Sequence, residues 1–301
     1  MKSVLITGAT SFLGLQIISQ IQSQNIELHI IARPTSDLSR IPNLDGLQCH
    51  TYDGSVNSLV TALQDAKADV CINLAGTYVR EHNSGDIDSL IDSNFRFGGH
   101  LLEAMKESRT EYLVNAGSTF QYFHSENSAP LNLYAAIKQS LFNLISYYAE
   151  SSDLTYVNII LPDVYGPSDW RPKIMTRLVE ANLKEIPLEL VDRETILGLV
   201  HVADAAEAFI YCARQLMNKQ NTFAGKCFGV DIGNRFRLDE IVQAVERCCE
   251  QHSIVNWGTY ATPERHVKVP WEGPTVPGWK PKITLENGIN QLVEEVRRGQ
   301  L

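Results

Sequence analysis

The sequence predicts an α/β protein whose core is a doubly wound parallel sheet, joined to a smaller C-terminal lobe. Short β-rich runs alternate with longer amphipathic segments along most of the chain, and the first run ends in a glycine-rich turn. Alternation of this kind is typical of parallel strands joined by right-handed helical crossovers. From about residue 166 the composition changes to turns, prolines and tryptophans, which suits either a smaller, loop-rich lobe or a C-terminal segment that wraps the core.

The individual elements follow from hydrophobic periodicity and from the residues that end each run. Strands are expected at residues 3–7, 27–32, 47–50, 69–74, 111–116, 155–160 and 227–231. Helices are expected at residues 13–24, 57–65, 86–107, 133–150, 174–182, 203–217 and 237–250.

Composition excludes several classes of function. The chain has 301 residues, enough for a large core, and its 44% hydrophobic and 20% charged content is ordinary for a globular protein. A net charge of −9 gives no general attraction to nucleic acid or to an anionic membrane. The six cysteines lack metal-ligand or disulfide spacing, and no apolar run is long enough to span a membrane. We therefore expect a cytoplasmic protein with reduced thiols, no signal peptide and no metal site.

The glycine-rich turn, TGATSFLG at residues 7–14, lies between an expected strand and an expected helix. This arrangement points backbone N–H groups and a helix N-terminus at one place, where they bind a pyrophosphate. Gly8 permits the tight turn, and Gly14 permits close packing of helix on strand. Ser11 stands where such turns usually have a middle glycine, but its side chain is small enough to let the backbone approach the phosphates.

Tyr134 and Lys138 are four residues apart on an expected helix, so their side chains share one face. An ammonium near a phenol favours the phenolate, and we expect Lys138 to lower the pKa of Tyr134. Such a tyrosine exchanges a proton with an alcohol near neutral pH. A hydroxyl from Ser118, or from its neighbour Thr119, can hold the same oxygen. With a hydride carrier bound at the glycine turn, this is equipment for interconverting a ketone and an alcohol.

Taken in order, these segments resemble the extended short-chain dehydrogenase/reductase family of nucleotide-sugar epimerases, dehydratases and ketoreductases. The resemblance implies a Rossmann fold, with Ser118, Tyr134 and Lys138 as catalytic residues and a homodimer as the assembly. It also implies a dinucleotide-binding part at residues 1–165 with 195–232, and a substrate-binding lobe at 166–194 with 233–301. The matching segments are TGATSFLG (7–14), NLAG (73–76), Asn94 in DSNFRFGGHLLEA, GST (117–119), YAAIK (134–138), DVYGP (163–167), LVHVADAAEA (199–208) and PGWKPKITLENGI (277–289).

The cofactor expected is NADP(H). Proteins of this fold that prefer NAD carry an acid at the end of the second strand, for the ribose hydroxyls. Here that strand ends in Ala32-Arg33, and an arginine pairs with a 2′-phosphate. Asp53 resembles the family's acid beside the adenine, and Asn94 lies behind the catalytic residues. The full set of expected cofactor contacts is Gly8, Thr10, Ser11, Phe12, Leu13, Arg33, Asp53, Gly54, Leu74, Ala75, Gly76, Asn94, Tyr134, Lys138, Pro162 and Val164.

The positions after Ser118 separate the family's reactions. Its 4,6-dehydratases carry an acidic pair there, whereas this chain has Thr119 and Phe120, which cannot remove a proton from carbon. Reduction of a 4-keto group by hydride, without loss of water, is the chemistry that remains. The expected substrate contacts are Thr119, Phe120, Arg171, Arg193 and His201.

The family's usual diphosphate-binding arginine is replaced by Leu197, so Arg193 is a substitute for that contact. TYVREHN (77–83), the short loop between Ser118 and Tyr122, and VNWG (255–258) resemble CDP-paratose and CDP-abequose synthases. These are reductases of CDP-linked 4-keto-3,6-dideoxyhexoses that contribute to surface polysaccharide. The base and the sugar stay open.

Two other functions remain. A nucleotide-sugar 4-epimerase uses the same Ser, Tyr and Lys with a tightly bound NAD. A regulatory protein that only binds NADP keeps the fold without needing a catalytic acid. Copurified NAD would favour the epimerase, and exchangeable NADPH the reductase.

Overall fold

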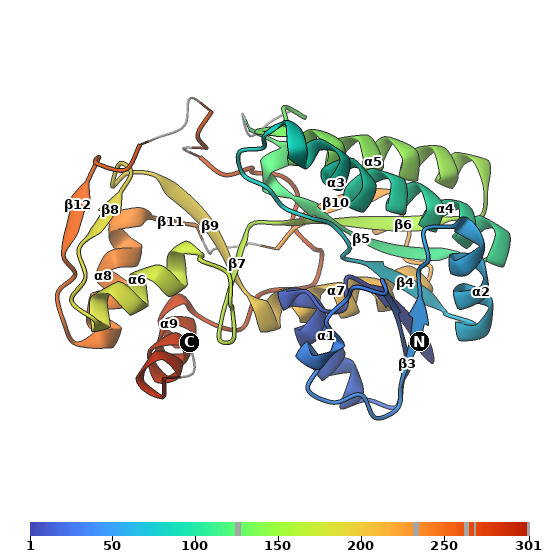
Figure 1. Cartoon of the computed structure of the whole chain (residues 1–301), viewed down its shortest axis with the longest axis horizontal. Helices are drawn as coiled ribbons and strands as arrows, with labels where there is room; N and C mark the ends of the chain where they lie inside the picture. Colours follow the sequence, from blue (N-terminus) through green and yellow to red (C-terminus); the bar gives the residue numbers. More distant parts are fainter. Residues whose placement is uncertain (124–127, 231–234, 262–264, 268, 300–301) are drawn as a thin grey trace.

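The computed structural model describes the chain except for residues 124–127, 231–234, 262–264, 268 and 300–301. Its centre is a seven-stranded sheet in the order β10-β6-β5-β4-β1-β2-β3, and every strand pair in it is parallel (Figure 1). The strand order reverses between β1 and β4, and in sheets of this kind ligands bind at that point. The strands are β1 (Ser3–Thr7), β2 (Glu27–Ala32), β3 (Leu47–Thr51), β4 (Val70–Asn73), β5 (Tyr112–Ser118), β6 (Thr155–Leu161) and β10 (Lys226–Gly229).

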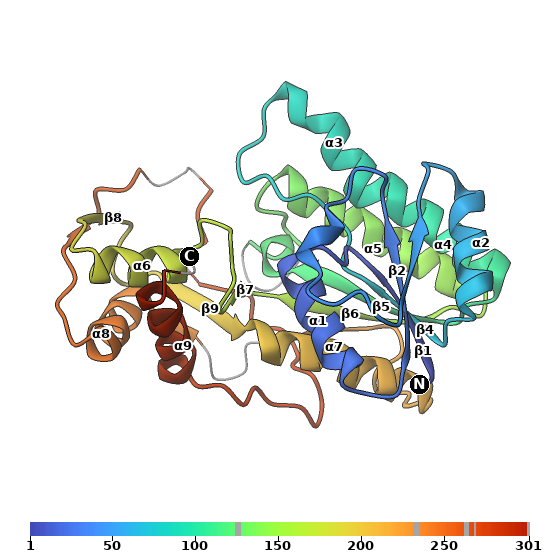
Figure 2. The same ribbon diagram turned by 60° about the horizontal axis from the view of Figure 1, so that its bottom comes forward.

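Helices cover both faces of this sheet. α1 (Phe12–Gln22) and α7 (Val202–Met217) pack on one face, and α2 (Val56–Ala66), α4 (Phe97–Ser108) and α5 (Leu133–Ser151) pack on the other. The view in Figure 2 brings α1 and α7 forward. Apolar side chains of the strands point to the two faces alternately, and those of Leu5 and Ile6 are fully buried on opposite sides. The doubly wound α/β fold predicted from the sequence is confirmed.

A second group of elements, here called the side lobe, lies beside the sheet. It consists of α6 (Ile174–Leu183), α8 (Leu238–Cys249) and α9 (Leu285–Arg297), with the parallel strands β8 (Leu188–Leu190) and β12 (Val255–Trp257). Its apolar side chains form a core of their own, in which Val179, Ile241 and Ile289 are fully buried. A three-stranded sheet of β7 (Asp163–Tyr165), β9 (Ile196–His201) and β11 (Arg235–Arg237) joins the side lobe to the central sheet.

Each strand predicted from the sequence corresponds to one strand of the central sheet, with ends that differ by at most two residues where both are described. The predicted end at Asp231 lies outside the described residues. The single helix expected at 86–107 is interrupted: η2 (Ser84–Asp86) and α3 (Ile87–Ile91) lead into a π-helical turn, η3 (Asp92–Arg96), before α4 begins. The short strands of the side lobe and helix α9 were not predicted.

Polar side chains cross the sheet in a buried ladder. Thr7 Oγ1 donates to Asn73 Oδ1 at 2.6 Å, Asn73 Nδ2 to Asn115 Oδ1 at 2.8 Å, and Asn115 Nδ2 to Asn158 Oδ1 at 2.9 Å. Asn158 Nδ2 then reaches the sulfur of Cys227 at 3.5 Å. The parallel register places these residues opposite one another on β1, β4, β5, β6 and β10. The ladder therefore fixes five strands at one level, just below their carboxyl ends.

Candidate active site

The glycine-rich turn between β1 and α1 has the geometry that its sequence predicts. Gly8 has a φ of +67°, and a Cβ there would come within 2.8 Å of the Leu74 carbonyl carbon. A Cβ on Gly14 would come within 2.5 Å of the Gly8 oxygen, so helix and turn pack without room for a side chain. Position 11 does not require a glycine, because Ser11 has a φ of −77° and its hydroxyl caps α1 by accepting from Gly14 N at 3.0 Å.

The end of β4 lies directly beside this turn. Ala75 N donates to Thr7 Oγ1 at 3.3 Å, so the amide ladder also holds the segment Leu74–Gly76. Asn94 lies in the π-helical turn and is buried, and its Nδ2 donates to Thr77 O at 2.9 Å and Leu90 O at 3.0 Å. Its Oδ1 has no hydrogen-bond partner among the described residues. A buried carbonyl oxygen without a donor is an available acceptor close to Gly76.

Tyr134 and Lys138 project from the first turns of α5, which Asn132 caps by accepting from Ala135 N at 3.0 Å. Lys138 is 3% exposed, and its Nζ donates to Ala116 O at 3.1 Å. Burial lowers the pKa of Lys138 to about 8.

The expected lowering of the Tyr134 pKa is wrong for this structure. Burial, and then the neighbouring Tyr78, raise the pKa of Tyr134 above its ordinary value. Burial disfavours the charged form of each side chain, so it raises the pKa of Tyr134 and lowers the pKa of Lys138. Tyr134 is therefore a phenol at neutral pH, with a proton to donate.

Ser118 and its neighbours lie where β5 ends. Ser118 Oγ caps the short 3₁₀ helix η4 (Thr119–Gln121) by accepting from Phe120 N at 3.3 Å, and Ser118 N donates to Gln121 Oε1 at 2.9 Å. The hydroxyl proton of Ser118 remains available to a further acceptor. The Phe120 ring packs 6.0 Å from the ring of Tyr78.

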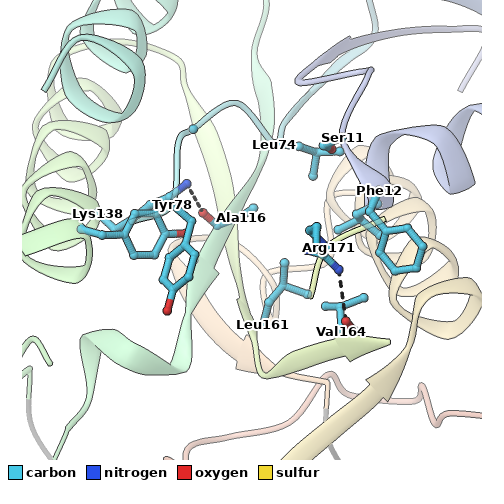
Figure 3. Close-up of a pocket in the computed structure, with 13 residues that line it drawn as sticks. Ser11, Phe12, Leu74, Tyr78, Ala116, Lys138, Leu161, Val164 and Arg171 are labelled. Atoms are coloured by element: carbon cyan, nitrogen blue, oxygen red, sulfur yellow. Dashed lines mark hydrogen bonds between the residues drawn. The ribbon is translucent and has the colours of Figure 1, made fainter. Parts of the chain in front are cut away.

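These elements enclose a cavity of about 160 Å³ at the carboxyl edge of the sheet (Figure 3). The glycine turn, the strand ends and α5 contribute its walls, and the segment after β7 closes one side. Its lining consists of Ser11, Phe12, Leu13, Leu74, Gly76, Tyr78, Ala116, Gly117, Tyr134, Lys138, Leu161, Val164 and Arg171. Within this lining the titratable side chains are two tyrosines, a lysine and an arginine, and none is a carboxylate or an imidazole.

The structure brings many of the predicted site residues together, but not all. Arg33 is exposed just after β2 and outside the cavity lining, and its backbone forms a turn with Ser36: Arg33 N donates to Ser36 Oγ at 2.9 Å and Arg33 O accepts from Ser36 N at 2.9 Å. The Asp53 carboxylate accepts from Ser55, which lowers the pKa of Asp53, and it lies beside Gly54 outside the cavity lining. Thr10 belongs to the glycine turn, and Pro162 joins β6 to β7 next to Val164.

Four of the predicted substrate contacts, Thr119, Phe120, Arg193 and His201, are outside the cavity lining. Arg193 is in the side lobe, with its guanidinium 5.5 Å from the ring of Trp257. His201 is 3% exposed, caps α7 by accepting from Ala203 N, and faces the ring of Tyr165. Burial lowers the pKa of His201. Arg171, by contrast, lines the cavity.

Four residues line the cavity although they were not predicted as site residues: Tyr78, Ala116, Gly117 and Leu161. Ala116 and Gly117 lie at the end of β5, just before Ser118. Tyr78 lies in the loop after β4, and its ring is 5.1 Å from that of Tyr134. All four residues lie just beyond or at the carboxyl end of a central strand, and this position is the signal that would have identified them.

The fold and this site together define an α/β protein built to bind a dinucleotide beside a tyrosine–lysine pair. The sequence profile of the NAD dependent epimerase/dehydratase family matches residues 4–224, and the chain belongs to that family.

The similarity to known proteins extends over most of the chain. A CDP-abequose synthase of Yersinia pseudotuberculosis is 27% identical over 262 residues, which is 87% of this chain and 89% of that one. A CDP-abequose synthase of Salmonella muenchen is 21% identical over 301 residues and 97% of each chain.

Solved structures share the fold at low identity. The UDP-glucuronic acid 4-epimerase of Bacillus cereus, in complex with UDP-glucuronic acid and NAD, superposes with a TM-score of 0.83 at 20% identity over 99% of each chain. The UDP-glucose 4-epimerase of Brucella ovis, also with NAD, has a TM-score of 0.84 at 17% identity over 98% of each chain. In the part of this chain that the structure describes, no helix could cross a membrane and no cluster of side chains could hold a metal ion.

Proposed function

We propose that the protein reduces the 4-keto group of a nucleotide-linked deoxy sugar with NADPH. One observation carries the proposal: the described lining of the cavity offers a tyrosine proton and a lysine, but no carboxylate or imidazole. A dehydratase or an epimerase acting at the carbons next to the ketone needs a base for carbon-bound protons. Reduction of the ketone needs only a hydride and a proton donor.

The site fits a nicotinamide dinucleotide. The close approach of Gly8 to β4 and of Gly14 to the turn leaves backbone N–H groups at the start of α1. Asn94 Oδ1 is an unused acceptor behind Gly76, and Arg33 is an exposed cation at the end of β2. These residues would hold the pyrophosphate, the cofactor ribose region and a 2′-phosphate, respectively. When bound, the reduced nicotinamide supplies the hydride.

The chain's own residues then manage the oxygen and its proton. Tyr134, whose pKa is raised, donates its hydroxyl proton to the oxygen as the carbonyl becomes an alkoxide. The ammonium of Lys138 favours the phenolate left behind and, with Nζ anchored on Ala116 O, keeps two further N–H donors for the cofactor ribose. Ser118 accepts from Phe120 N and can donate its hydroxyl hydrogen to the same substrate oxygen.

The similarity to CDP-abequose synthases supports a CDP-linked 4-keto-3,6-dideoxyhexose as the substrate. We also propose that the protein acts as a homodimer in the cytoplasm, in the synthesis of surface polysaccharide. We further propose that residues 1–165 with 195–232 hold the cofactor. Residues 166–194 with 233–301 then bind the nucleotide sugar.

A second candidate is a 4-epimerase that retains NAD. It is favoured by the fold similarity to epimerases solved with NAD. The two differ in what the cofactor does, because an epimerase returns the hydride to its substrate and a reductase consumes NADPH.

The test is a panel of CDP-, UDP- and dTDP-linked 4-keto sugars offered to the purified protein with NADPH or NADH, followed by cofactor absorbance. Stoichiometric oxidation of NADPH by a 4-keto sugar is expected. Conversion of a 4-hydroxy sugar into its epimer without net cofactor change, by a protein that retains NAD on purification, would contradict the reductase and establish the epimerase.

A further inference from the structure

The segment between β7 and α6, residues 166–171, is called the strap because it contacts both the side lobe and the glycine turn. At one end Ser168 N donates to Glu295 Oε1 of α9 at 2.6 Å. At the other, the ring of Trp170 meets the ring of Phe12 edge to face at 6.1 Å. The guanidinium of Arg40 lies 4.5 Å from the Trp170 ring. In Figure 1 this yellow-green loop descends between α9 and α1.

Arg171 is held in one orientation by the strap. Its Nε and Nη2 donate to the two carboxylate oxygens of Asp169 at 2.6 and 2.8 Å, and Nη2 also donates to Val164 O at 3.2 Å. Asp169 is 1% exposed, so the carboxylate is a fixed anchor. The guanidinium lies 4.7 Å from the ring of Phe12, a residue of the glycine-rich turn that also lines the cavity. A two-point pair with a buried carboxylate pre-organises the guanidinium plane.

The position of Arg171 in the cavity indicates which group of a ligand it is complementary to. The described cavity lining has two cations, Lys138 and Arg171, and they lie on opposite sides of the cavity (Figure 3). Lys138 lies at the Tyr134 side, whereas Arg171 lies beside Ser11 and Phe12, where the chain turns into α1. Nη1 of Arg171 makes no hydrogen bond among the described residues. A cation with free donors beside a helix N-terminus is complementary to a pyrophosphate.

We propose that Arg171, a residue of the strap, binds the pyrophosphate of the dinucleotide cofactor. This rests on the cofactor site proposed above, and it replaces the expectation that Arg171 contacts the sugar substrate. The cofactor then touches both parts of the molecule, because the same anion contacts the start of α1 and the strap. The strap is in turn anchored on α9 through Ser168 and Glu295. Cofactor binding therefore orders the side lobe against the central sheet.

The test measures equilibrium binding to the full chain without any sugar substrate. The probes are NADPH, NADH, adenosine 2′-monophosphate, which lacks the pyrophosphate, and free CDP and UDP, whose binding should not depend on Arg171. Arg171→Gln is expected to weaken binding of both dinucleotides by about ten- to a hundredfold, as for a lost charge-assisted hydrogen bond. Binding of adenosine 2′-monophosphate should be unchanged. Arg177→Gln, at an exposed position on α6, is the matched control and should bind every probe like the wild type.

Several outcomes overturn the proposal. Equal affinity of wild type and Arg171→Gln for NADPH does so, and so does a loss confined to free CDP or UDP, which would assign Arg171 to the sugar nucleotide. An equal loss for adenosine 2′-monophosphate does so too, because the variant would then have disturbed the adenosine end. A wild-type protein that binds no dinucleotide would overturn the proposed function together with this inference. Dinucleotide binding that is indifferent to Arg171 would overturn this inference alone.

A second variant guards against misfolding. Arg171→Gln leaves the buried carboxylate of Asp169 without its cation, which is a recognised cause of strong destabilisation. The double variant Asp169→Asn/Arg171→Gln removes both charges and keeps amide groups that can bond to each other. It should show the same selective loss of dinucleotide binding, with a thermal unfolding temperature close to that of the wild type. A double variant that folds and binds NADPH normally would contradict the proposal.

Discussion

The ring of Tyr78 stands edge to face against the ring of Tyr134, with centroids 5.1 Å apart and planes at 87°. Tyr78 also packs 6.0 Å from Phe120, and the Lys173 ammonium lies 5.3 Å from its ring centroid. This aromatic contact adds to the burial that raises the Tyr134 pKa. A tyrosine that holds its proton at neutral pH can serve as the proton donor when a ketone is reduced.

Tyr134→Phe is expected to lower the turnover of the 4-keto sugar by about 10²–10⁴-fold, the usual contribution of a general acid. NADPH affinity should stay near that of the wild type, because the change removes one oxygen. Tyr147→Phe is the matched control, since Tyr147 is on the same helix and 59% exposed. Steady-state kinetics and cofactor fluorescence check both variants. Turnover close to wild type in Tyr134→Phe would mean that another group supplies the proton.

Lys138→Met is expected to abolish reduction and yet stabilise the fold. Burial lowers the Lys138 pKa from 10.5 to about 8, so the folded state disfavours the ammonium that the unfolded chain accepts. This destabilisation is fully present below about pH 8 and disappears as the pH rises towards 10.5. At pH 7 the variant should be more stable by at most about 3 kcal/mol.

Urea unfolding at pH 7 and at pH 9.5 measures this effect. The advantage of Lys138→Met over wild type should shrink at the higher pH. Lys106→Met, at a 45% exposed side chain of α4, should show no such pH-dependent difference. A variant less stable than wild type at both pH values would show that the bond from Nζ to Ala116 O outweighs the desolvation of the ammonium.

The seven strands of the central sheet were predictable because each is a compact apolar run bounded by turn residues. The strands β8 and β12 of the side lobe have three residues each, too few for a period to emerge. The roles of Gly8 and Gly14 were predictable because glycine is needed where the backbone has a positive φ or packs too closely for a side chain. Tyr78 was missed because it lies in a loop.

The Tyr134 pKa was mispredicted for a different reason. The spacing of Tyr134 and Lys138 predicts a charge near the phenol but says nothing about burial. Here burial decides the direction in which the pKa of each side chain shifts. That His201 and Arg193 contact the substrate stays a prediction, although neither lines the cavity. Which side chains reach a cavity depends on how elements distant in sequence pack together, and no local pattern encodes that packing.

Asn115→Leu is expected to destabilise the protein by about 2–4 kcal/mol, because it leaves the amide of Asn73 and the carbonyl oxygen of Asn158 buried without partners. Asn57→Leu, at an exposed position on α2, should change stability little. Chemical unfolding compares the two variants with wild type. Equal stability of Asn115→Leu and wild type would mean that the ladder orients the strands without stabilising them.

Arg33→Ala is expected to weaken NADPH binding by about 1.5–3 kcal/mol and to leave NADH binding nearly unchanged. Arg33 is exposed at the end of β2, where the 2′-phosphate of the adenosine ribose would lie. Titration of both cofactors into the variant, with Arg177→Ala as a control of equal charge change, separates phosphate recognition from general electrostatics. Similar losses for NADPH and NADH would assign Arg33 to the adenine or to stability instead.

Reduction should occur at the keto carbon only, and this distinguishes the proposed reaction from that of an epimerising reductase. Thr119 and Phe120, which follow Ser118, carry no acid or base. In the described cavity lining the titratable side chains are Tyr78, Tyr134, Lys138 and Arg171, and none is a carboxylate or an imidazole. In D₂O with unlabelled NADPH, the product should contain no enzyme-dependent deuterium on the carbons beside the former ketone.

With 4-deuterated NADPH, one deuterium should appear at the former carbonyl carbon, as read by NMR. A reaction without enzyme gives the background exchange. Deuterium at C3 or C5 beyond that background would require a base near the substrate. His266 is then the first residue to replace, because Arg265 donates to Pro130 O and Leu131 O and so ties this segment to the start of α5. Loss of the exchange in His266→Gln, with reduction retained, would assign the protein to the epimerising reductases.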